Sequence, residues 1–326
     1  MPDPKKNSSI FSFKKNQLRF LILCCIFFIP VIIAYGIIEI AINKVPNNFS
    51  IIKDYMDAEN SNIETMVFGS SQIQVGINPS FLGDPAINFS SRGQHHNIDF
   101  TLLKGLIERF PNLKTIVFEV SYGHFELPHR SKYFWKNSIF LKYYHVNTFE
   151  RAVTPIDSLL FKSHPGKFSE MLVTHYLSDT IPDVYNKYGF DLNHYEGKFR
   201  KLNYDSATII TKPVQIYKRE DVKVLAHNSE YFYKMIEYCL ERNLKVIVLS
   251  PPTFSNYNQQ RNPNVLRRRD SILTYIEDTY ENVYFLNAEK DSDFIVEDFR
   301  NENHLNPKGA EKLTKKLNSF LKKIGE

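Results

Sequence analysis

Short apolar runs alternate with longer segments of helical periodicity along this chain. Five runs rich in β-branched and aromatic residues lie at 65–68, 86–89, 114–120, 245–249 and 283–286. Apolar residues recur at helical spacing over 97–110 and 229–243. Strands that are apolar throughout are typical of parallel sheets buried on both faces. The pattern therefore predicts an α/β fold, a three-layer α/β/α sandwich whose five parallel strands carry active groups at their carboxyl ends.

The alternation of strand-like and helix-like segments is interrupted at about 127–225, where tyrosine, phenylalanine, histidine and lysine are frequent. We interpret this stretch as a mainly helical insert. Beside an active site, its aromatic and slightly basic character suits stacking on sugar rings or holding an anionic polymer. The alternative is a packing subdomain whose aromatic residues are core.

The N-terminal region is a predicted membrane anchor. Residues 20–38 are apolar over about the 20 residues that a spanning helix requires, and charged residues flank them. Under the positive-inside rule, the basic residues before this run predict a cytoplasmic stub at 1–19, an anchor at 20–42 and an extracytoplasmic domain at 43–326. A cleaved signal peptide is the competing interpretation, but no small-x-small cleavage site follows the run cleanly.

Charge and cysteine content narrow the function classes. The chain carries +5, of which the first 19 residues hold +4 through five basic residues and one acidic residue. Since no basic field lies elsewhere, we expect no nucleic-acid partner. Cys24 and Cys25 fall in the predicted anchor and Cys239 stands alone beyond it, so no disulfide is predicted. Cys24 superficially resembles a lipidation site, but bulky Leu23 precedes it where a small residue is needed.

Two short motifs carry the chemistry. Gly69-Ser70-Ser71 follows the first strand run, and His304 precedes the last helix-like segment about 230 residues later. A serine in a strand-to-helix turn lies near backbone N–H groups, and a histidine accepts its proton when a third group orients the ring. This predicts serine-based acyl chemistry with Ser71 as nucleophile and His304 as base. The structural alternatives are a common loop tripeptide and a histidine beside a helix cap, since Asn306-Pro307 also suits a helix start.

In these motifs the chain resembles the SGNH (GDSL-like) hydrolase superfamily. The resemblance is to its membrane-anchored envelope branch, which includes the teichoic-acid D-alanyl transfer protein and the alginate acetyltransferases. It covers most of 64–317 outside the insert and implies the flavodoxin-like SGNH fold. The first family block corresponds to Gly69-Ser70-Ser71, and Gly93 corresponds to the second-block glycine whose N–H helps bind the oxyanion. The last block, Asp-x-x-His, corresponds to Asn301-Glu302-Asn303-His304.

Departures from the family pattern concern the oxyanion site. The third block normally places an asparagine after the third strand, where this chain has Glu119-Val120-Ser121. The resemblance then implies Ser71, Gly93 and Ser121 as oxyanion donors, unless a backbone N–H replaces Ser121 or only two donors remain. Glu119 either faces the site or is a satisfied, half-buried charge.

A second departure concerns the acid of the triad. Asn301 stands where the family has aspartate, and it is the implied partner of His304. An asparagine orients the ring but does not stabilise an imidazolium as a carboxylate does. Asp298 and Glu302 are the alternative acids, and both also suit solvated loop positions.

We therefore expect a membrane-anchored serine esterase or O-acyltransferase that acts on acyl esters of a cell-envelope glycan. The expected location is the cytoplasmic membrane of a bacterium, with the N-terminus inside. Expected partners are an acylated polysaccharide and a membrane-bound O-acyltransferase. The alternative is a non-catalytic accessory protein that binds the glycan or that acyltransferase. No cofactor is expected, and no metal, because adjacent His95 and His96 point apart and no third ligand stands at useful spacing.

Overall fold

The computed structural model describes residues 15–129, 134–178 and 184–325. It divides into two compact units. The smaller unit consists of 1–45 and 160–179, and the larger unit consists of 46–159 and 180–326. The chain therefore leaves the larger unit after residue 159 and returns to it at residue 180.

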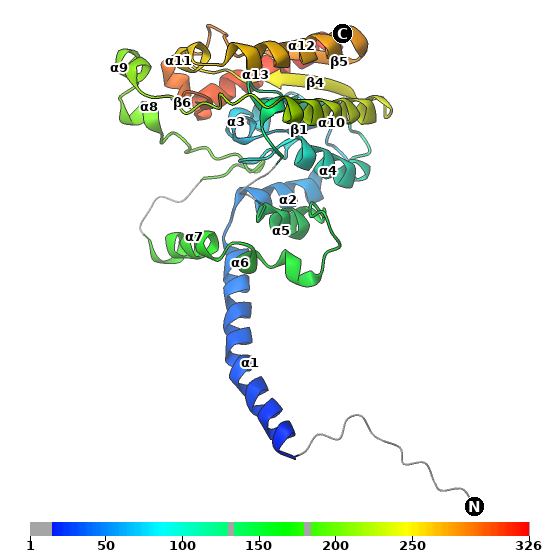
Figure 1. Cartoon of the computed structure of the whole chain (residues 1–326), viewed down its shortest axis with the longest axis vertical. Helices are drawn as coiled ribbons and strands as arrows, with labels where there is room; N and C mark the ends of the chain where they lie inside the picture. Colours follow the sequence, from blue (N-terminus) through cyan, green and yellow to red (C-terminus); the bar gives the residue numbers. More distant parts are fainter. Residues whose placement is uncertain (1–14, 130–133, 179–183, 326) are drawn as a thin grey trace, which may run out of the picture. The chain divides into compact units, whose positions relative to one another are not determined.

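The larger unit is built on a five-stranded parallel sheet. Its strands are β1 (Thr65–Phe68), β2 (Ala86–Asn88), β3 (Thr115–Glu119), β4 (Lys245–Ser250) and β5 (Val283–Asn287). They lie in the order β2-β1-β3-β4-β5, with every neighbouring pair parallel. Strands β1, β4 and β5 of this sheet are labelled in Figure 1. All five predicted strand runs are thus confirmed, with ends that differ by at most one residue.

Helices connect these strands, and a small hairpin precedes the last helix. The α-helices of the larger unit are α2 (Asn48–Glu59), α3 (Ser71–Gly76), α4 (His96–Leu106), α5 (Lys136–Ile139), α8 (Lys198–Lys201), α9 (Ser206–Thr211), α10 (Val222–Leu240), α11 (Ser255–Gln259), α12 (Pro263–Thr279) and α13 (Pro307–Gly325). Shorter turns are η1 (Pro79–Phe81), η2 (Ile107–Arg109), η3 (His124–Glu126), the π-helical η4 (Phe140–Tyr144), η5 (Pro155–Ser158) and η6 (Val296–Asp298). The antiparallel hairpin consists of β6 (Phe299–Asn301) and β7 (His304–Leu305).

Core side chains leave the strands alternately, as the pleat of a strand requires. The rings of Phe68 and Phe118 stack with centroids 5.9 Å apart, and Phe232 of α10 lies 6.0 Å from Phe118. Val67 and Val117, which precede these two phenylalanines, belong to a different buried cluster that includes Leu313 of α13. Both β1 and β3 are fully buried, which is why apolar residues fill the middle of each strand.

The strand topology gathers the site at one edge of the sheet. Because all five strands are parallel, the residues that follow β1, β3 and β4 emerge at the same edge. Helix α3 starts there directly after β1, and it contacts both β7 and α13. The β6–β7 hairpin is thereby held beside the start of α3.

The predicted insert at 127–225 contains helices of 4 to 13 residues joined by irregular stretches. Helix α10 begins within this range, at Val222. Trp135, Tyr143 and Tyr144 are buried, so these aromatic residues are core. Phe134, by contrast, is 67% exposed. The limits and the role of the insert stay a prediction.

The smaller unit contains α1 (Lys15–Lys44), α6 (Leu160–Ser163) and α7 (Pro165–Leu177). Within α1, residues Gln17–Lys44 are long and apolar enough to cross a membrane, and the predicted anchor at 20–42 lies inside this span. Both α6 and α7 contact α1. The two cysteines Cys24 and Cys25 are part of α1.

Candidate active site

The segment Gly69–Ser71, which we call the nucleophile turn, joins β1 to α3. The Ser70 side chain caps α3 by accepting the backbone N–H of Gln72 at 3.3 Å. At Gly69, an added Cβ would lie 2.7 Å from Oε2 and 2.8 Å from Cβ of Glu119. Only glycine therefore allows β3 to approach the turn this closely.

Glu119, at the end of β3, holds the nucleophile turn. Its Oε2 accepts the backbone N–H of Ser70 at 2.6 Å, and its Oε1 accepts the Ser70 hydroxyl at 3.0 Å. The side chain is completely buried. Burial raises the pKa of the Glu119 carboxyl, and its hydrogen bonds from Ser70 and Ser121 act in the opposite direction. Glu119 is thus a buried acid whose hydrogen bonds are satisfied, and it also positions the turn that carries Ser71.

Ser71, His304 and Asn301 form a hydrogen-bonded chain. Ser71 Oγ lies 2.8 Å from Nε2 of His304, and Nδ1 of His304 lies 3.0 Å from Oδ1 of Asn301. The hairpin pairs Asn301 directly with His304, which explains the second contact. Residues 233 positions apart are thus in contact at the carboxyl edge of the sheet.

The proton positions in this chain follow from the partners. The backbone N–H of Asn303 donates to Oδ1 of Asn301 at 3.1 Å, so this side-chain atom is assigned as the oxygen. An oxygen facing Nδ1 requires a proton on Nδ1 of His304. Nε2 then carries the lone pair that faces the Ser71 hydroxyl, which is the tautomer that a general base needs.

The pKa of His304 is lowered from 6.5 to about 4. Burial is the main cause, and the positive charge of Arg300 and Arg92 and the proximity of His194 add to it. His304 is therefore neutral at pH 7. Asn301 contributes orientation without a compensating negative charge.

The two alternative acids are engaged elsewhere. Asp298 is buried, accepts the backbone N–H of Ile295 at 3.0 Å and pairs with Lys312. Glu302 pairs with Lys198. Nδ1 of His304 instead faces Asn301, so the hairpin presents the amide rather than either carboxylate to the ring.

The predicted oxyanion donors Ser71, Gly93 and Ser121 all line the same cavity. Ser71 is the first residue of α3, Gly93 has a left-handed backbone with φ +72°, and both line two cavities. Ser121 lines the first of these cavities, but its hydroxyl turns toward Glu119 and toward Nδ1 of His124, 3.5 Å away. The Ser121 side chain is thus the donor least available to an oxyanion.

Two cavities meet at Ser71 and Gly93. The first, of about 790 Å³, is lined by His95, Phe134 and Arg151, among others. The second, of about 590 Å³, contains His304 and a polar wall. The Ser71 hydroxyl can therefore be approached from two directions.

One wall of the second cavity is a hydrogen-bonded chain of charged and polar groups, which the sequence analysis did not predict. Arg300 donates to Nε2 of His194 and, at 2.8 Å, to the backbone oxygen of Glu196. Nδ1 of His194 lies 3.1 Å from Asp191. Because an arginine only donates, His194 must carry its proton toward Asp191. Nothing in the local sequence marks Asp191 and His194, since they approach the hairpin from about 110 residues upstream.

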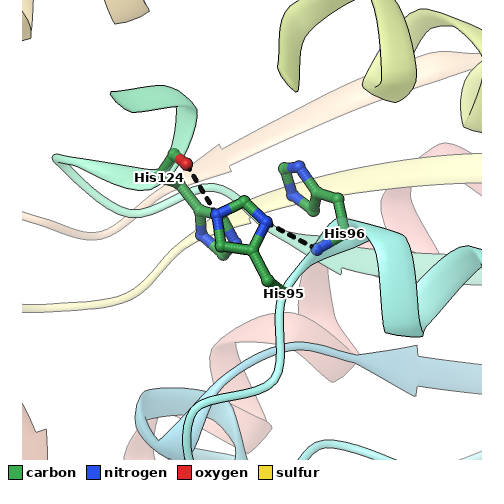
Figure 2. A group of neighbouring side chains, drawn as sticks. All are labelled: His95, His96 and His124. Carbon is green, nitrogen blue, oxygen red and sulfur yellow. Dashed lines mark hydrogen bonds between the residues drawn. The ribbon is translucent and has the colours of Figure 1, made fainter. Parts of the chain in front are cut away.

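A histidine cluster lies at the first cavity, which His95 and His124 line. The possible ligand nitrogens of His95, His96 and His124 all lie within 4.8 Å of one another. His124 comes from η3, so the third histidine that spacing alone did not show is supplied by the fold. His95 nevertheless uses both nitrogens, accepting the His96 N–H at 2.9 Å and donating to the His124 carbonyl at 2.8 Å (Figure 2).

Geometry makes this cluster a poor metal site. The rings of His96 and His124 are stacked 4.2 Å apart at 7°, so their in-plane lone pairs cannot meet at one ion. His96 also donates from Nε2 to the Glu119 carbonyl at 3.1 Å. Burial is the largest cause lowering the pKa of all three histidines, to about 3 for His96. The cluster is therefore neutral and packs as an aromatic group.

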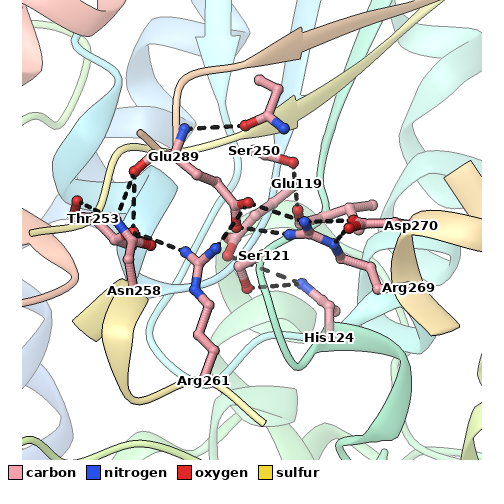
Figure 3. A network of polar contacts seen from close by, with 12 residues as sticks. Glu119, Ser121, His124, Ser250, Thr253, Asn258, Arg261, Arg269, Asp270 and Glu289 are labelled. Carbon is pink, nitrogen blue, oxygen red and sulfur yellow. Dashed lines mark hydrogen bonds and ion pairs between the residues drawn. The ribbon is translucent and has the colours of Figure 1, made fainter. Parts of the chain in front are cut away.

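A second buried polar network braces the sheet edge (Figure 3). Glu289, just beyond β5, accepts hydrogen bonds from Arg269 of α12 at 2.7 and 2.9 Å and forms an ion pair with Arg261 at 3.0 Å. Arg261 donates to the Thr253 hydroxyl at 2.8 Å, and the Ser250 hydroxyl donates to the Val120 carbonyl at 2.8 Å. The network thus connects the residues that follow three strands and stiffens the edge that carries the site.

Comparison with protein-family models gives no match to this chain, and a search of curated proteins finds no relative that matches significantly. The geometry of the site is therefore the basis on which we infer a function.

Proposed function

We propose that this chain is a membrane-anchored serine esterase or O-acyltransferase of the SGNH type that acts on acyl esters of a cell-envelope glycan. The single observation that carries this proposal is the contact of Ser71 Oγ with Nε2 of His304 at 2.8 Å. Asn301 on the opposite ring nitrogen completes a serine, histidine and orienting-group arrangement.

In the proposed mechanism, His304 takes the Ser71 proton as the hydroxyl attacks the acyl carbonyl. The N–H groups of Ser71 and Gly93 stabilise the oxyanion. His304 returns the proton to the leaving alcohol, and an acyl-serine remains. Water or a sugar hydroxyl then gives its proton to His304 and attacks the acyl carbon. The bond from that carbon to Ser71 Oγ breaks, and His304 returns the proton to Ser71.

The two cavities that meet at Ser71 favour transfer over hydrolysis. An acyl donor in one cavity and a glycan hydroxyl in the other can reach the same serine in turn. Hydrolysis requires only one such cavity plus water. The expected partners are an acylated envelope polysaccharide and a membrane-bound O-acyltransferase.

The wider organisation agrees with this proposal. Opposite sheet faces packed by α10 and α13 support the three-layer sandwich of the SGNH type. The apolar helix α1 supports a single-pass anchor. We propose that it spans the cytoplasmic membrane of a bacterium, with the N-terminal stub inside because of its basic residues.

A specific observation favours a second candidate, a non-catalytic accessory protein. Asn301 leaves the imidazolium of His304 without a carboxylate, and the lowered pKa of about 4 makes the ring a weak base. A cavity lined by aromatic residues suits glycan binding in either case.

Labelling with a fluorophosphonate probe separates the two candidates. The full chain, in detergent micelles, is compared with Ser71→Ala, His304→Ala and Ser70→Ala. Ser70→Ala is the matched control, because it removes a neighbouring hydroxyl and keeps the backbone N–H that Glu119 holds.

Loss of labelling in Ser71→Ala and His304→Ala, with labelling retained in Ser70→Ala, is the expected result. A folded wild-type chain that the probe does not label would reject the enzyme and favour the accessory protein.

A further inference from the structure

The smaller unit places an apolar surface next to the end of the anchor helix. Val173, Tyr176 and Leu177 in α7 are 54%, 51% and 81% exposed. Their i, i+3 and i+4 spacing puts them on one side of the last helical turns. On α1, the nearby Ile37 and Ile40 are 60% and 57% exposed.

A buried carboxylate fixes this segment to α1. Glu39 is only 6% exposed, and its two oxygens accept the backbone N–H groups of Leu160 and Phe161 at 3.1 and 2.7 Å. The ring of Phe161 packs on Tyr35 with centroids 5.6 Å apart. A charge at the end of an apolar helix is costly unless it is paired, and here the start of α6 satisfies it.

A hydrogen bond between Tyr176 and Ala41 shows where α7 lies along the length of α1. The hydroxyl of Tyr176 donates to the Ala41 carbonyl of α1 at 3.3 Å. Exposed apolar side chains of α1 run from Leu18 to Ile40, 23 positions that span about 34 Å at 1.5 Å per residue. Since a hydrocarbon core is about 30 Å thick, Ala41 lies at its boundary when α1 spans a bilayer.

We propose that α7 is an interfacial helix whose Val173, Tyr176 and Leu177 side chains enter the lipid beside α1. Tyrosine is enriched at this depth because its ring is apolar and its hydroxyl finds polar partners. Exposed apolar side chains continuous with a lipid-facing anchor are covered by the same lipid. The segment 160–178 is thus a second membrane contact, which depends on the proposed anchoring by α1 and not on the chemistry at Ser71.

Site-directed spin labelling tests this contact in the full chain. Cys24 and Cys25 are replaced by alanine, whereas Cys239 is retained, because it is buried and its thiol pKa is raised to about 12 by burial. Single cysteines then replace Val173 or Leu177, and His175→Cys is the matched control. His175 is exposed and lies two positions from each test site, so it points to the other side of α7.

The protein is reconstituted in vesicles of phosphatidylcholine and phosphatidylglycerol, with a reference label at Ile29→Cys inside α1. Collision rates with oxygen, which concentrates in lipid, and with a water-soluble nickel chelate are compared. We expect labels at 173, 177 and 29 to favour oxygen at least threefold over the label at 175.

The reference label separates failure of this proposal from failure of the anchor. Labels at 173 and 177 that behave like the one at 175, while the label at 29 favours oxygen, would overturn the interfacial helix and leave the anchor intact. A label at 29 that is open to the nickel chelate would overturn both.

Discussion

Replacing Asn301 with aspartate tests whether the missing charge limits the site. The amide oxygen of Asn301 already accepts from Nδ1 of His304 at 3.0 Å and from the Asn303 N–H at 3.1 Å. A carboxylate of nearly the same shape keeps both hydrogen bonds. It adds a negative charge beside a ring whose surroundings are otherwise positive, through Arg300 and Arg92.

The expected magnitude follows from the pKa of His304. Its fall from 6.5 to about 4 makes protonation about 3 kcal/mol less favourable than in water. An opposite charge at this distance raises such a pKa by about 1–3. Because the imidazolium forms during attack, Asn301→Asp is expected to accelerate acylation of Ser71 by about 10- to 1,000-fold.

The assay is the second-order rate constant of fluorophosphonate labelling between pH 3.5 and 9. In wild type, the rate is expected to fall to half near pH 4, because protonation of His304 removes the base. In Asn301→Asp this midpoint is expected near pH 5–7.

The matched control is Asn303→Asp, which adds the same charge two residues away while the Asn301 amide stays on Nδ1. Equal acceleration in both variants would refute the reasoning. Any negative charge near the site would then have the same effect, whether or not it contacts the ring of His304. An unchanged rate and midpoint in Asn301→Asp would refute it as well.

Three further predictions concern the support of the site. Since His95, His96 and His124 have lowered pKa values, the unfolded chain binds protons that the folded chain excludes, and stability is lost as pH falls below 6.5. Denaturant unfolding should show a loss of about 1.4 kcal/mol per pH unit for each histidine, partly offset by the raised pKa of Glu119, and equal stability at pH 7 and pH 5 would contradict this. Gly69→Ala should lower the free energy of unfolding by about 1–3 kcal/mol and abolish probe labelling, because its Cβ meets Glu119 at 2.8 Å; a fully reactive variant would show that the turn can relax. Glu119→Ala should cost about 1–3 kcal/mol and slow labelling at least tenfold, whereas Glu119→Gln, which keeps an acceptor, should retain most stability; equal losses in both would assign the effect to charge alone.

The sheet and the central pair of the site were predictable from local patterns. Parallel strands buried on both faces are continuous apolar runs, so their number and limits could be derived from the sequence. Ser71 follows such a run at the start of a helix, and His304 precedes another helix, so topology alone brings both to the same region.

The partner of His304 could not be chosen from the sequence. Asn301, Asp298 and Glu302 all lie within six residues of the histidine. The choice depends on the hairpin register, which pairs Asn301 with His304, and on two lysines that pair with the carboxylates, Lys312 from the following helix and Lys198 from about 100 residues upstream. Neither the hairpin register nor these ion pairs can be derived from the residues next to His304.

Register between the two central strands explains why Glu119 supports the nucleophile. Phe68 pairs with Phe118, so Gly69 and Glu119 are the next residues on each strand. A slip of one residue would turn the carboxylate to the opposite face and leave the N–H of Ser70 without its present acceptor. Burial raises the pKa of Glu119, which means that the charged carboxylate is less favourable here than in water. The contact at Ser70 gives this buried acid a role that packing alone does not provide, because it couples the geometry of the sheet to the position of Ser71.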